Sequence, residues 1–376
     1  MFMKFVHIGD LHLGKVLHQY SLLDIQRELL FELLEYMKQE NIKVLVIAGD
    51  VYDRLIPSQE AVNVLDEFLS QAILKYHIQI LMISGNHDSS DRMHFASSLL
   101  SSQGLHIATH LKKEMEYVEI DKSRFYLLPF FKPSQVKSLH EVDLHTYQEA
   151  MAYYLSQQTI DNHYQNILIT HQFVGRSSLT CESEMPLSVG GSEIIDAHLF
   201  EQFDYVALGH LHSPQKVSKE TIRYSGSLMC YSFDEVNHKK SIVVVDTDNM
   251  SIHLHSLHPS LTLKKYKGTF EQLMNKDFIS QKEDYLSFEL EDTTLIPHAV
   301  DQLRLIYPHV LQITYSYLTH QQSHSSCHSI ESLKKMDNIE LFTQFYKDVK
   351  NMELNEQQYK IIKELLEKAG ELDESH

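Results

Sequence analysis

The sequence predicts a layered α/β fold that is followed by a smaller α/β unit and by a pair of helices near the C-terminal end. Over the first part of the chain, short apolar runs that end in polar loops alternate with longer amphipathic segments. This alternation is typical of strands and helices that pack in layers. With 376 residues, 43% of them hydrophobic, the chain is long enough for one large domain with an appendage.

Five short apolar runs are the expected strands of the large domain. Each run is rich in β-branched or aliphatic residues and stops at a polar loop, as strands do. Later segments at 222–226, 241–246 and 251–257 follow one another without helices between them, so we expect the second half of this domain to be richer in β structure. The five runs are KFVHI, VLVIA, IQILMIS, NILIT and YVAL, which end at residues 8, 48, 84, 170 and 208.

Two amphipathic segments lie between the first three runs and are predicted to be helices. Residues 22–41 and residues 58–77, which follow Pro57, place apolar side chains three or four positions apart, so each helix has one face to bury. We also expect a helix near 93–102. The apolar faces consist of Leu22, Ile25, Leu29, Leu33 and Met37 in the first segment and of Ala61, Leu65, Phe68, Ala72 and Tyr76 in the second.

The character of the sequence changes after residue 258. We divide the chain into a core at 1–258, a small α/β unit at 259–318, a polar linker at 319–337 and two amphipathic helices within 338–369. The small unit combines the strand-like runs YLSFEL and VLQITYSY with a helical segment between them. Two short helices behind a polar tether bury little apolar surface against each other, so we expect them to dock on another surface.

Composition argues against several classes of protein. Three cysteines at wide spacings form neither a disulfide framework nor a thiolate metal site, which indicates a reducing compartment. No apolar run approaches ~20 residues and no signal peptide is evident, so we expect a cytoplasmic protein that does not cross a membrane. The net charge of −18 argues on its own against a nucleic-acid-binding protein, although it says nothing about local fields.

Potential metal ligands follow each of the five expected strands. Loops at the carboxyl ends of strands form the binding sites of open α/β sheets, so we expect these side chains to converge. Carboxylate, imidazole and amide groups suit borderline-to-hard divalent ions such as manganese, iron or zinc. Ligands two residues apart point to one side if their segment is extended. The candidate ligands are Asp10, His12, Asp50, Asn86, His171, His210 and His212.

Histidine is abundant in this chain, at 25 of 376 residues, so a single histidine carries little weight. Any one of the candidates could equally be a structural residue. Their recurrence at the ends of apolar runs, however, is not explained by packing. The set as a whole therefore favours a metal site.

The order of these motifs resembles the calcineurin-like metallophosphoesterases. The motifs are D-x-H from Asp10, G-D-x-x-D around Asp50, G-N-H-D around Asn86, a single histidine at His171 and G-H-x-H from His210. Together they are specific for that superfamily, but they do not specify the substrate.

Two further stretches narrow the resemblance to the SbcD family of nucleases. They are EMPLSVGGSEIIDAHLF at 184–200 and RYSGSLMCYSFDE at 223–235. The resemblance covers nearly the whole chain and implies a β-sandwich core flanked by helices, a capping domain at 259–318 and the C-terminal helix pair. Asp53 is the residue of the bacterial type, whereas archaeal and eukaryotic relatives carry histidine at this position.

The resemblance implies two divalent metal ions, with manganese expected, that activate a water molecule and clamp the phosphate. It also implies that His87 acts on the transition state or protonates the departing 3′ oxygen. The alternative is that His87 holds Asp10 in place. Asp88 is expected to stabilise its loop. In the implied ligand scheme, Asp10, His12 and His212 hold one ion, Asn86, His171 and His210 hold the other, and Asp50 bridges the two.

A member of this family would be a double-strand 3′–5′ exonuclease and single-strand endonuclease that cleaves hairpins and DNA ends. It would act with an SbcC-type ATPase, on which the C-terminal helix pair docks, in DNA repair, replication and recombination. A homodimer is expected through the helices at 58–77 and 93–102, because Leu65, Phe68 and Leu69 cannot all face one sheet. Positive charge near the motifs would come from Lys15, Arg54, Arg92 and Arg176.

Two other interpretations stay open. One is a phosphatase or phosphodiesterase that acts on small substrates, and the other is a scaffold whose metal site is idle. The capping unit and the helix pair favour the nuclease, because a small-substrate enzyme has no evident need for them. A complete ligand set that includes His87 counts against the idle site.

Overall fold

The computed structural model describes residues 3–175 and 194–317 continuously, and residues 339, 342, 343, 346, 354, 355, 357–363 and 365 of the C-terminal region. The chain forms two compact units. The first consists of Met1–Tyr266, Ile279–Ser287 and Arg304–Leu311, and the second of Lys267–Phe278, Phe288–Leu303 and Gln312–His376. All the predicted ligands belong to the first unit.

Two six-stranded sheets form the first unit, and all five strands expected from the apolar runs are present as β1, β4, β5, β9 and β10. The first sheet has the order β14 (Ser251–His255), β13 (Ile242–Asp246), β1 (Lys4–Ile8), β4 (Val44–Ala48), β5 (Gln79–Ile83) and β6 (Leu105–Ala108). The second has the order β11 (Gln215–Val217), β12 (Lys219–Tyr224), β10 (Tyr205–Gly209), β9 (Gln165–His171), β8 (Ser123–Leu128) and β7 (Glu116–Ile120). In the first sheet, β1, β4, β5 and β6 are parallel, and β13 and β14 pair antiparallel at one side. In the second sheet, β12, β10, β9 and β8 are parallel, and the edge strands β11 and β7 pair antiparallel.

The two sheets pack face to face around an apolar core. Strand β4 illustrates the arrangement, because its side chains alternate between the two faces. Val46 packs in the core between the sheets with Ile169 of β9, whereas Leu45 and Ile47 pack on the outer face of their own sheet. Burial on both faces explains why the strand is a continuous apolar run in the sequence. The β-sandwich that the resemblance implied is therefore confirmed.

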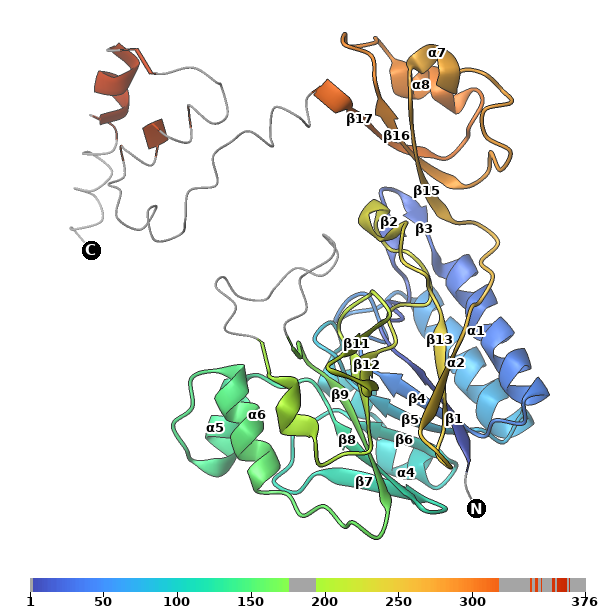
Figure 1. Cartoon of the computed structure of the whole chain (residues 1–376), viewed down its shortest axis with the longest axis vertical. Coiled ribbons are helices and arrows are strands. Elements are labelled where there is room, and N and C mark those ends of the chain that lie inside the picture. Colours follow the sequence, from blue (N-terminus) through green and yellow to red (C-terminus); the bar gives the residue numbers. More distant parts are fainter. Residues whose placement is uncertain are drawn as a thin grey trace. The chain divides into compact units, whose positions relative to one another are not determined.

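Helices cover the outer faces of both sheets (Figure 1). Helices α1 (Leu23–Gln39) and α2 (Gln59–Ser70, continued by a π-helical turn at Gln71–Lys75) pack on the first sheet, and α5 (Pro133–His140) and α6 (Tyr147–Ser156) pack on the second. Helix α2 begins where Ser58 Oγ accepts a hydrogen bond from the Ala61 N–H at 3.2 Å, as an N-cap serine does. The apolar faces predicted for 22–41 and 58–77 are buried throughout.

Two expectations for the helices were wrong. The segment near 93–102 is not one helix but two short ones, α3 (Ser90–His94) and α4 (Ser97–Ser101). The chain breaks because Ala96 adopts a left-handed conformation, with φ of 58°, which a helix cannot accommodate. Phe68 was expected to face a second copy, but it is fully buried in the core beneath α2. A charge at Phe68 would therefore unfold the protein, not separate two subunits.

A three-stranded sheet of order β15 (Leu263–Gly268), β16 (Tyr285–Leu290) and β17 (Val310–Tyr315) follows, with α7 (Phe270–Leu273) and α8 (Ala299–Arg304). These elements confirm the strands and the helix expected after residue 258. The remaining short elements of the first unit are β2 (Val16–Leu17), β3 (Tyr20–Ser21) and the 3₁₀ turns η2 (Ala197–Phe200) and η3 (Phe233–Glu235).

The linker at 319–337 and most of the predicted helix pair lie outside the described residues, as do Arg176 and most of the stretch 184–200. In the C-terminal region, the described residues 357–363 are helical. Within the part of the chain that the structure describes, no helix has the length and apolar character needed to cross a membrane.

Candidate metal centre

The ends of the two sheets meet at the predicted site. The backbone N–H of His210, which follows β10, donates to Asp10 Oδ1 after β1 at 2.9 Å. His171 Nε2, at the end of β9, lies 3.3 Å from Asp50 Oδ2 after β4. Because the sandwich brings the carboxyl ends of these strands to one edge, the five loops converge as the sequence predicted.

The loops have an unusual backbone at the ligands. Asp10, His12 and Asp50 have φ values of 52°, 44° and 49°, and His210 has 111°. Such conformations cost a non-glycine residue about 1–3 kcal/mol and persist only where the surroundings impose them. Here the N–H groups of Asp10 and His12 donate to the carbonyls of Gly49 and Asp50, both at 3.0 Å. The D-x-H segment is therefore not extended, which corrects the expectation, although its two side chains still meet.

The candidate ligands form two overlapping groups. Asp10, His12 and His212 bring one ligand atom each to within 4.8 Å of one another, and Asp10, Asp50 and His171 do the same. His12 Nε2 and His212 Nε2 are 3.1 Å apart. Asp50 Oδ2 lies 3.7 Å from His12 Nε2 and 3.3 Å from His171 Nε2, so its carboxylate lies between the two groups.

Asn86 and His210 complete the second group. Asn86 Oδ1 lies 3.0 Å from His171 Nε2 and 3.1 Å from His210 Nδ1. The structure thus brings together all seven side chains that the sequence pointed to. Two ligands that bind one ion at about 2.1 Å and at right angles are about 3 Å apart, so these spacings fit metal coordination.

The protonation states also fit divalent cations. Burial, together with the charge of His171, lowers the pKa of His210 to about 3, and burial holds the pKa of His12 well below its usual range. Both imidazoles are therefore neutral at pH 7, as metal ligands must be. Burial raises the pKa of Asp10 to about 7, which marks a carboxylate that lacks enough positive charge nearby.

Asp50 and His171 form an ion pair at the centre of the site. Burial alone would raise the pKa of Asp50, but the charge and the hydrogen bond of His171 hold it below its usual range. In turn, burial would lower the pKa of His171, and Asp50 outweighs this and raises it to about 9. Asp50 therefore requires a positive charge beside it. A divalent ion at this position would supply that charge and leave His171 neutral, as a metal ligand must be.

His87 stands beside the ligands. Its backbone N–H donates to Asp50 Oδ1 at 2.8 Å, and its Nδ1 donates to the carbonyl of Asp53 at 3.2 Å. The imidazole is half-buried and meets the ring of His12 edge-on, with centroids 4.8 Å apart. Among the described residues, no hydrogen bond joins His87 to Asp10. The ring could also serve with His12 and Asp50 as a ligand.

Two polar residues hold the ligand loops in place. Asp88 accepts hydrogen bonds from the N–H groups of Val51, Tyr52 and Gly85, at 3.1, 3.0 and 2.8 Å, and so ties the loop after β4 to the loop after β5. This confirms that Asp88 stabilises its loop.

Sequence reasoning missed the second of these residues, Gln26 of α1. Its Nε2 donates to the carbonyls of Leu11 and His12, at 2.9 and 2.8 Å, and its Oε1 accepts from the N–H of Gly14 at 3.1 Å. It thereby fixes the backbone of the D-x-H loop. The one signal in the sequence that could have indicated this role was a polar residue, Gln26, next to Ile25 of the apolar face of 22–41.

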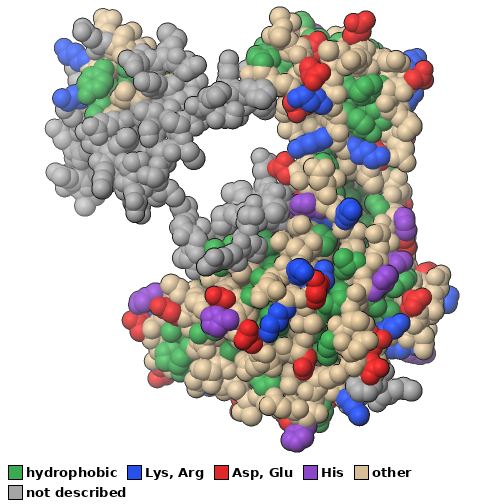
Figure 2. All heavy atoms as spheres, viewed as in Figure 1, with side chains coloured by type: hydrophobic (Ala, Val, Ile, Leu, Met, Phe, Trp, Pro, Cys, Tyr) green, Lys and Arg blue, Asp and Glu red, His purple; other side chains and the backbone are tan. Residues whose placement is uncertain are grey.

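Basic side chains border the site only in part. Lys15 Nζ binds Asp53 Oδ1 at 2.9 Å, and Arg54 Nε lies 3.7 Å from Asp53 Oδ2. Arg92 instead lines an apolar groove beside α2. On the face that Figure 2 shows, acidic and basic side chains intermingle and form no single basic surface.

Two glycines of the motifs are required by close approaches of the chain. A Cβ atom at Gly85 would lie 2.1 Å from Asp50 Oδ1. At Gly209 it would lie 1.9 Å from the carbonyl oxygen of Ala48 and 2.7 Å from His171 Nδ1. Since His171 Nδ1 donates to that same carbonyl at 2.8 Å, any side chain at position 209 would displace a ligand.

We therefore expect Gly209→Ala to lower the free energy of unfolding by about 3 kcal/mol, at the upper end of the usual cost of overpacking. It should also reduce the content of bound metal, because His171 loses its orientation. Gly9→Ala is the matched control, since a Cβ there meets its nearest atoms at an ordinary 3.4 Å. Urea denaturation and elemental analysis measure both effects. Wild-type stability and metal content in Gly209→Ala would contradict the close approach.

Comparisons with known proteins agree with this geometry. A family model described as calcineurin-like phosphoesterase matches residues 3–214, and one described as Type 5 capsule protein repressor C-terminal domain matches residues 260–350. A curated relative, the SbcD component of nuclease SbcCD from Staphylococcus epidermidis, is 35% identical over 371 residues, which cover 97% of this chain and 98% of the relative.

Solved structures are less similar. A protein of Thermus thermophilus has 9% identity and a TM-score of 0.41, covering 69% of this chain and 100% of that one. A dimetal phosphatase from Danio rerio has 11% identity and a TM-score of 0.34, covering 68% and 99%. On the family model and the curated relative, the chain belongs to the calcineurin-like phosphoesterases and, among them, to the SbcD family of nuclease SbcCD.

Proposed function

We propose that this metal-dependent phosphodiester hydrolase is a DNA nuclease that works with an SbcC-type ATPase. The observation that carries the proposal is the convergence of seven ligand side chains from five loops, with a half-buried histidine beside them. The similarity to a component of a nuclease extends over 97% of the chain, beyond the part that any phosphatase of the superfamily would need. We expect exonuclease activity on duplex ends and endonuclease activity on single strands and hairpins.

The ligand spacings support a division of the site between two ions. Asp10, His12 and His212 would hold one ion, and Asp50, which lies between the groups, would contact both. The second ion would be held by Asn86, His171 and His210. Mixed imidazole, carboxylate and amide donors suit manganese, which we expect to support the highest activity.

This division predicts different losses of metal in two variants. Asp50→Ala should lose both ions, because each would lose a shared carboxylate, whereas His212→Ala should lose about one. Asp91→Ala is the control, since its side chain is 95% exposed and lies outside the site. Elemental analysis of protein dialysed against manganese gives the count. Two ions retained in Asp50→Ala would rule out the bridging role.

The chain's own groups would divide the work of hydrolysis. Two bound divalent ions supply Lewis acidity and a nucleophile at neutral pH. His171 Nδ1 donates to the carbonyl of Ala48 at 2.8 Å, so Nε2, 3.3 Å from Asp50 Oδ2, is the nitrogen that would bind an ion. His87 donates from Nδ1 to the Asp53 carbonyl, which leaves Nε2 as the nitrogen available to a substrate. We infer that the imidazolium form, which also carries a hydrogen on this nitrogen, stabilises the reacting phosphate or protonates the departing 3′ oxygen and so becomes neutral.

His87→Ala should therefore retain its metals and its DNA affinity but lose turnover by about 10²–10⁴-fold, the usual size of general acid catalysis. The assay uses single-stranded, hairpin and blunt duplex DNA with manganese, with and without the ATPase. Elemental analysis of the same samples is the control. Loss of metal in His87→Ala would make the residue a ligand or a ligand support, and no nuclease activity in the wild type would refute the proposed function.

We propose the domains as a core at 1–258, a capping domain at 259–318, a linker at 319–337 and docking helices within 338–369. The described part of the last helix exposes Tyr359, Ile361 and Leu365, and exposed apolar side chains on a short helix favour burial on a partner. Deletion of 330–376 should leave metal binding intact and abolish co-purification with the ATPase.

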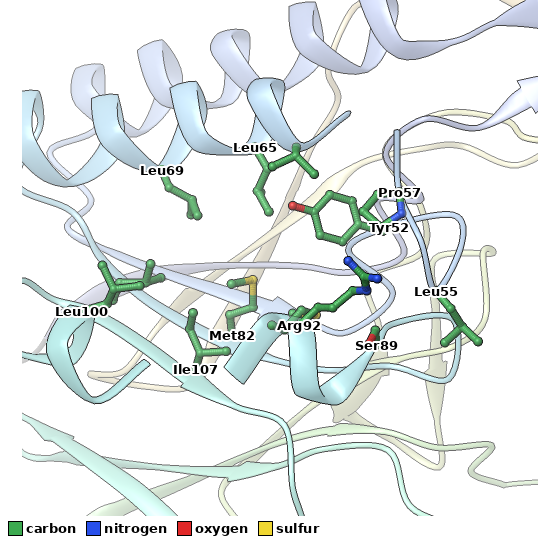
Figure 3. Close-up of a pocket in the computed structure, with 13 residues that line it drawn as sticks. Tyr52, Leu55, Pro57, Leu65, Leu69, Met82, Ser89, Arg92, Leu100 and Ile107 are labelled. Atoms are coloured by element: carbon green, nitrogen blue, oxygen red, sulfur yellow. The ribbon is translucent and has the colours of Figure 1, made fainter. Parts of the chain in front are cut away.

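A homodimer is also proposed, through the groove between α2 and the α3–α4 segment. Figure 3 shows Leu65 and Leu69 pointing from α2 toward Met82 and Leu100 across this groove, whose volume is about 290 Å³. Most residues that line it are apolar, with Ser89 and Arg92 as the polar exceptions, and Leu99 of α4 is 75% exposed. Such a surface is suited to a second copy of the same face. Leu99→Glu should sediment as a monomer with an intact fold, whereas a monomeric wild type would refute the dimer.

A further inference from the structure

A buried ion pair adjoins the predicted ligand His212 and lies outside the set of seven ligands. It consists of Glu235, at the end of η3, and Lys240, a few residues further along the chain. The side chain of Glu235 is 0% exposed and that of Lys240 is 11% exposed. The pair belongs to the loop after β12 that carries the stretch 223–235.

The contacts of this pair converge on one imidazole. His212 Nδ1 lies 3.0 Å from Glu235 Oε1. Lys240 Nζ donates to Glu235 Oε2 at 2.5 Å, to the carbonyl of His212 at 2.9 Å and to Ser227 Oγ at 2.8 Å. The side chain and the backbone of His212 are therefore both held by the same two residues.

These contacts determine the tautomer of His212. An ionised carboxylate only accepts hydrogen bonds, so His212 Nδ1 must carry the hydrogen and donate it. The ammonium group of Lys240, 2.5 Å from Glu235 Oε2, favours the ionised form of this buried carboxylate. His212 Nε2 is then the nitrogen whose lone pair can coordinate a metal ion, and it is the atom 3.1 Å from His12 Nε2.

We propose that Glu235 is a positioning residue that keeps the lone pair of His212 Nε2 aimed at the metal centre, with Lys240 supplying the charge that lets the carboxylate be buried. This inference rests on the proposed ligand role of His212. A carboxylate behind a ligand imidazole fixes its orientation and raises its basicity, and removing such a partner usually lowers metal affinity about 10–100-fold.

A purely structural role for the pair is the competing explanation. A buried ion pair contributes little to stability compared with apolar residues of the same volume, whereas removal of one partner is strongly destabilising. Stability alone would therefore be restored if both charges were removed together. Metal affinity would not be restored, because the imidazole would still lack its carboxylate.

The first test compares Glu235→Gln with wild type in titrations of the apoprotein with Mn²⁺, with free Mn²⁺ measured by electron paramagnetic resonance. We expect one of the two ions to bind about 10–100-fold more weakly and the other to bind as in wild type. Asp234→Asn is the matched control, because the neighbouring carboxylate is 40% exposed and pairs with Lys265 at 3.0 Å. Unchanged affinity for both ions in Glu235→Gln would overturn the inference.

The second test uses the double variant Glu235→Gln with Lys240→Met. Its thermal unfolding temperature should recover toward that of the wild type, while the weak Mn²⁺ affinity of the single variant persists. Recovery of both quantities together would assign the pair a structural role only and overturn the inference. If His212→Ala bound both ions as tightly as wild type, the ligand assignment itself would be wrong, and the inference would fall with it.

Discussion

The structure depends on keeping one carboxylate charged in a place where water does not reach it. Asp50 is buried at the junction of the two sheets, where an isolated carboxylate would be expensive to ionise. It stays ionised because His171 pairs with it and the backbone N–H of His87 donates to it. The surrounding loops position the imidazole and the N–H group that contact Asp50. The strained backbone at the ligands, the close glycines and the buried supports all follow from packing so many polar groups around one point.

The sandwich makes this arrangement possible because it packs the parallel strands of one sheet against those of the other. A single open sheet would place Asp10, Asp50 and Asn86 along one edge. The remaining candidate ligands at the ends of β9 and β10 require the second sheet. The core between the sheets brings the end of β9 against the end of β4 closely enough that Gly209 can carry no side chain. The packing of the apolar core therefore determines the geometry of the metal centre. The addition of a single methyl group at the junction would disturb both.

The sequence predicted the strands, and the convergence of the candidate ligands, because both depend on local signals that coincide. A buried strand is an apolar run in the sequence, and the polar residue at its end is the candidate ligand, as at Asp10 after β1 and His171 in β9. Residues that act through distant contacts carry no such signal. Gln26 and Glu235 hold ligands from other elements, 14 and 23 positions away along the chain. Phe68 was misassigned for the same reason, since only the fold reveals which apolar side chains of α2 lie over the sheet.

The acidic composition can be reconciled with a DNA substrate by the charge at the centre. A chain with a net charge of −18 repels phosphate at long range. The two proposed divalent ions would bring four positive charges to a buried site whose carboxylates are Asp10 and Asp50, so the local field there would be positive. Lys15 contributes little to this field, because Asp53 neutralises it at 2.9 Å. Recognition of the scissile phosphate by this chain thus depends on the ions themselves. If the substrate is DNA, as proposed, the backbone contacts that dominate DNA affinity would fall mainly to the proposed ATPase partner, which would give a physical reason for the nuclease to act as one component of a complex.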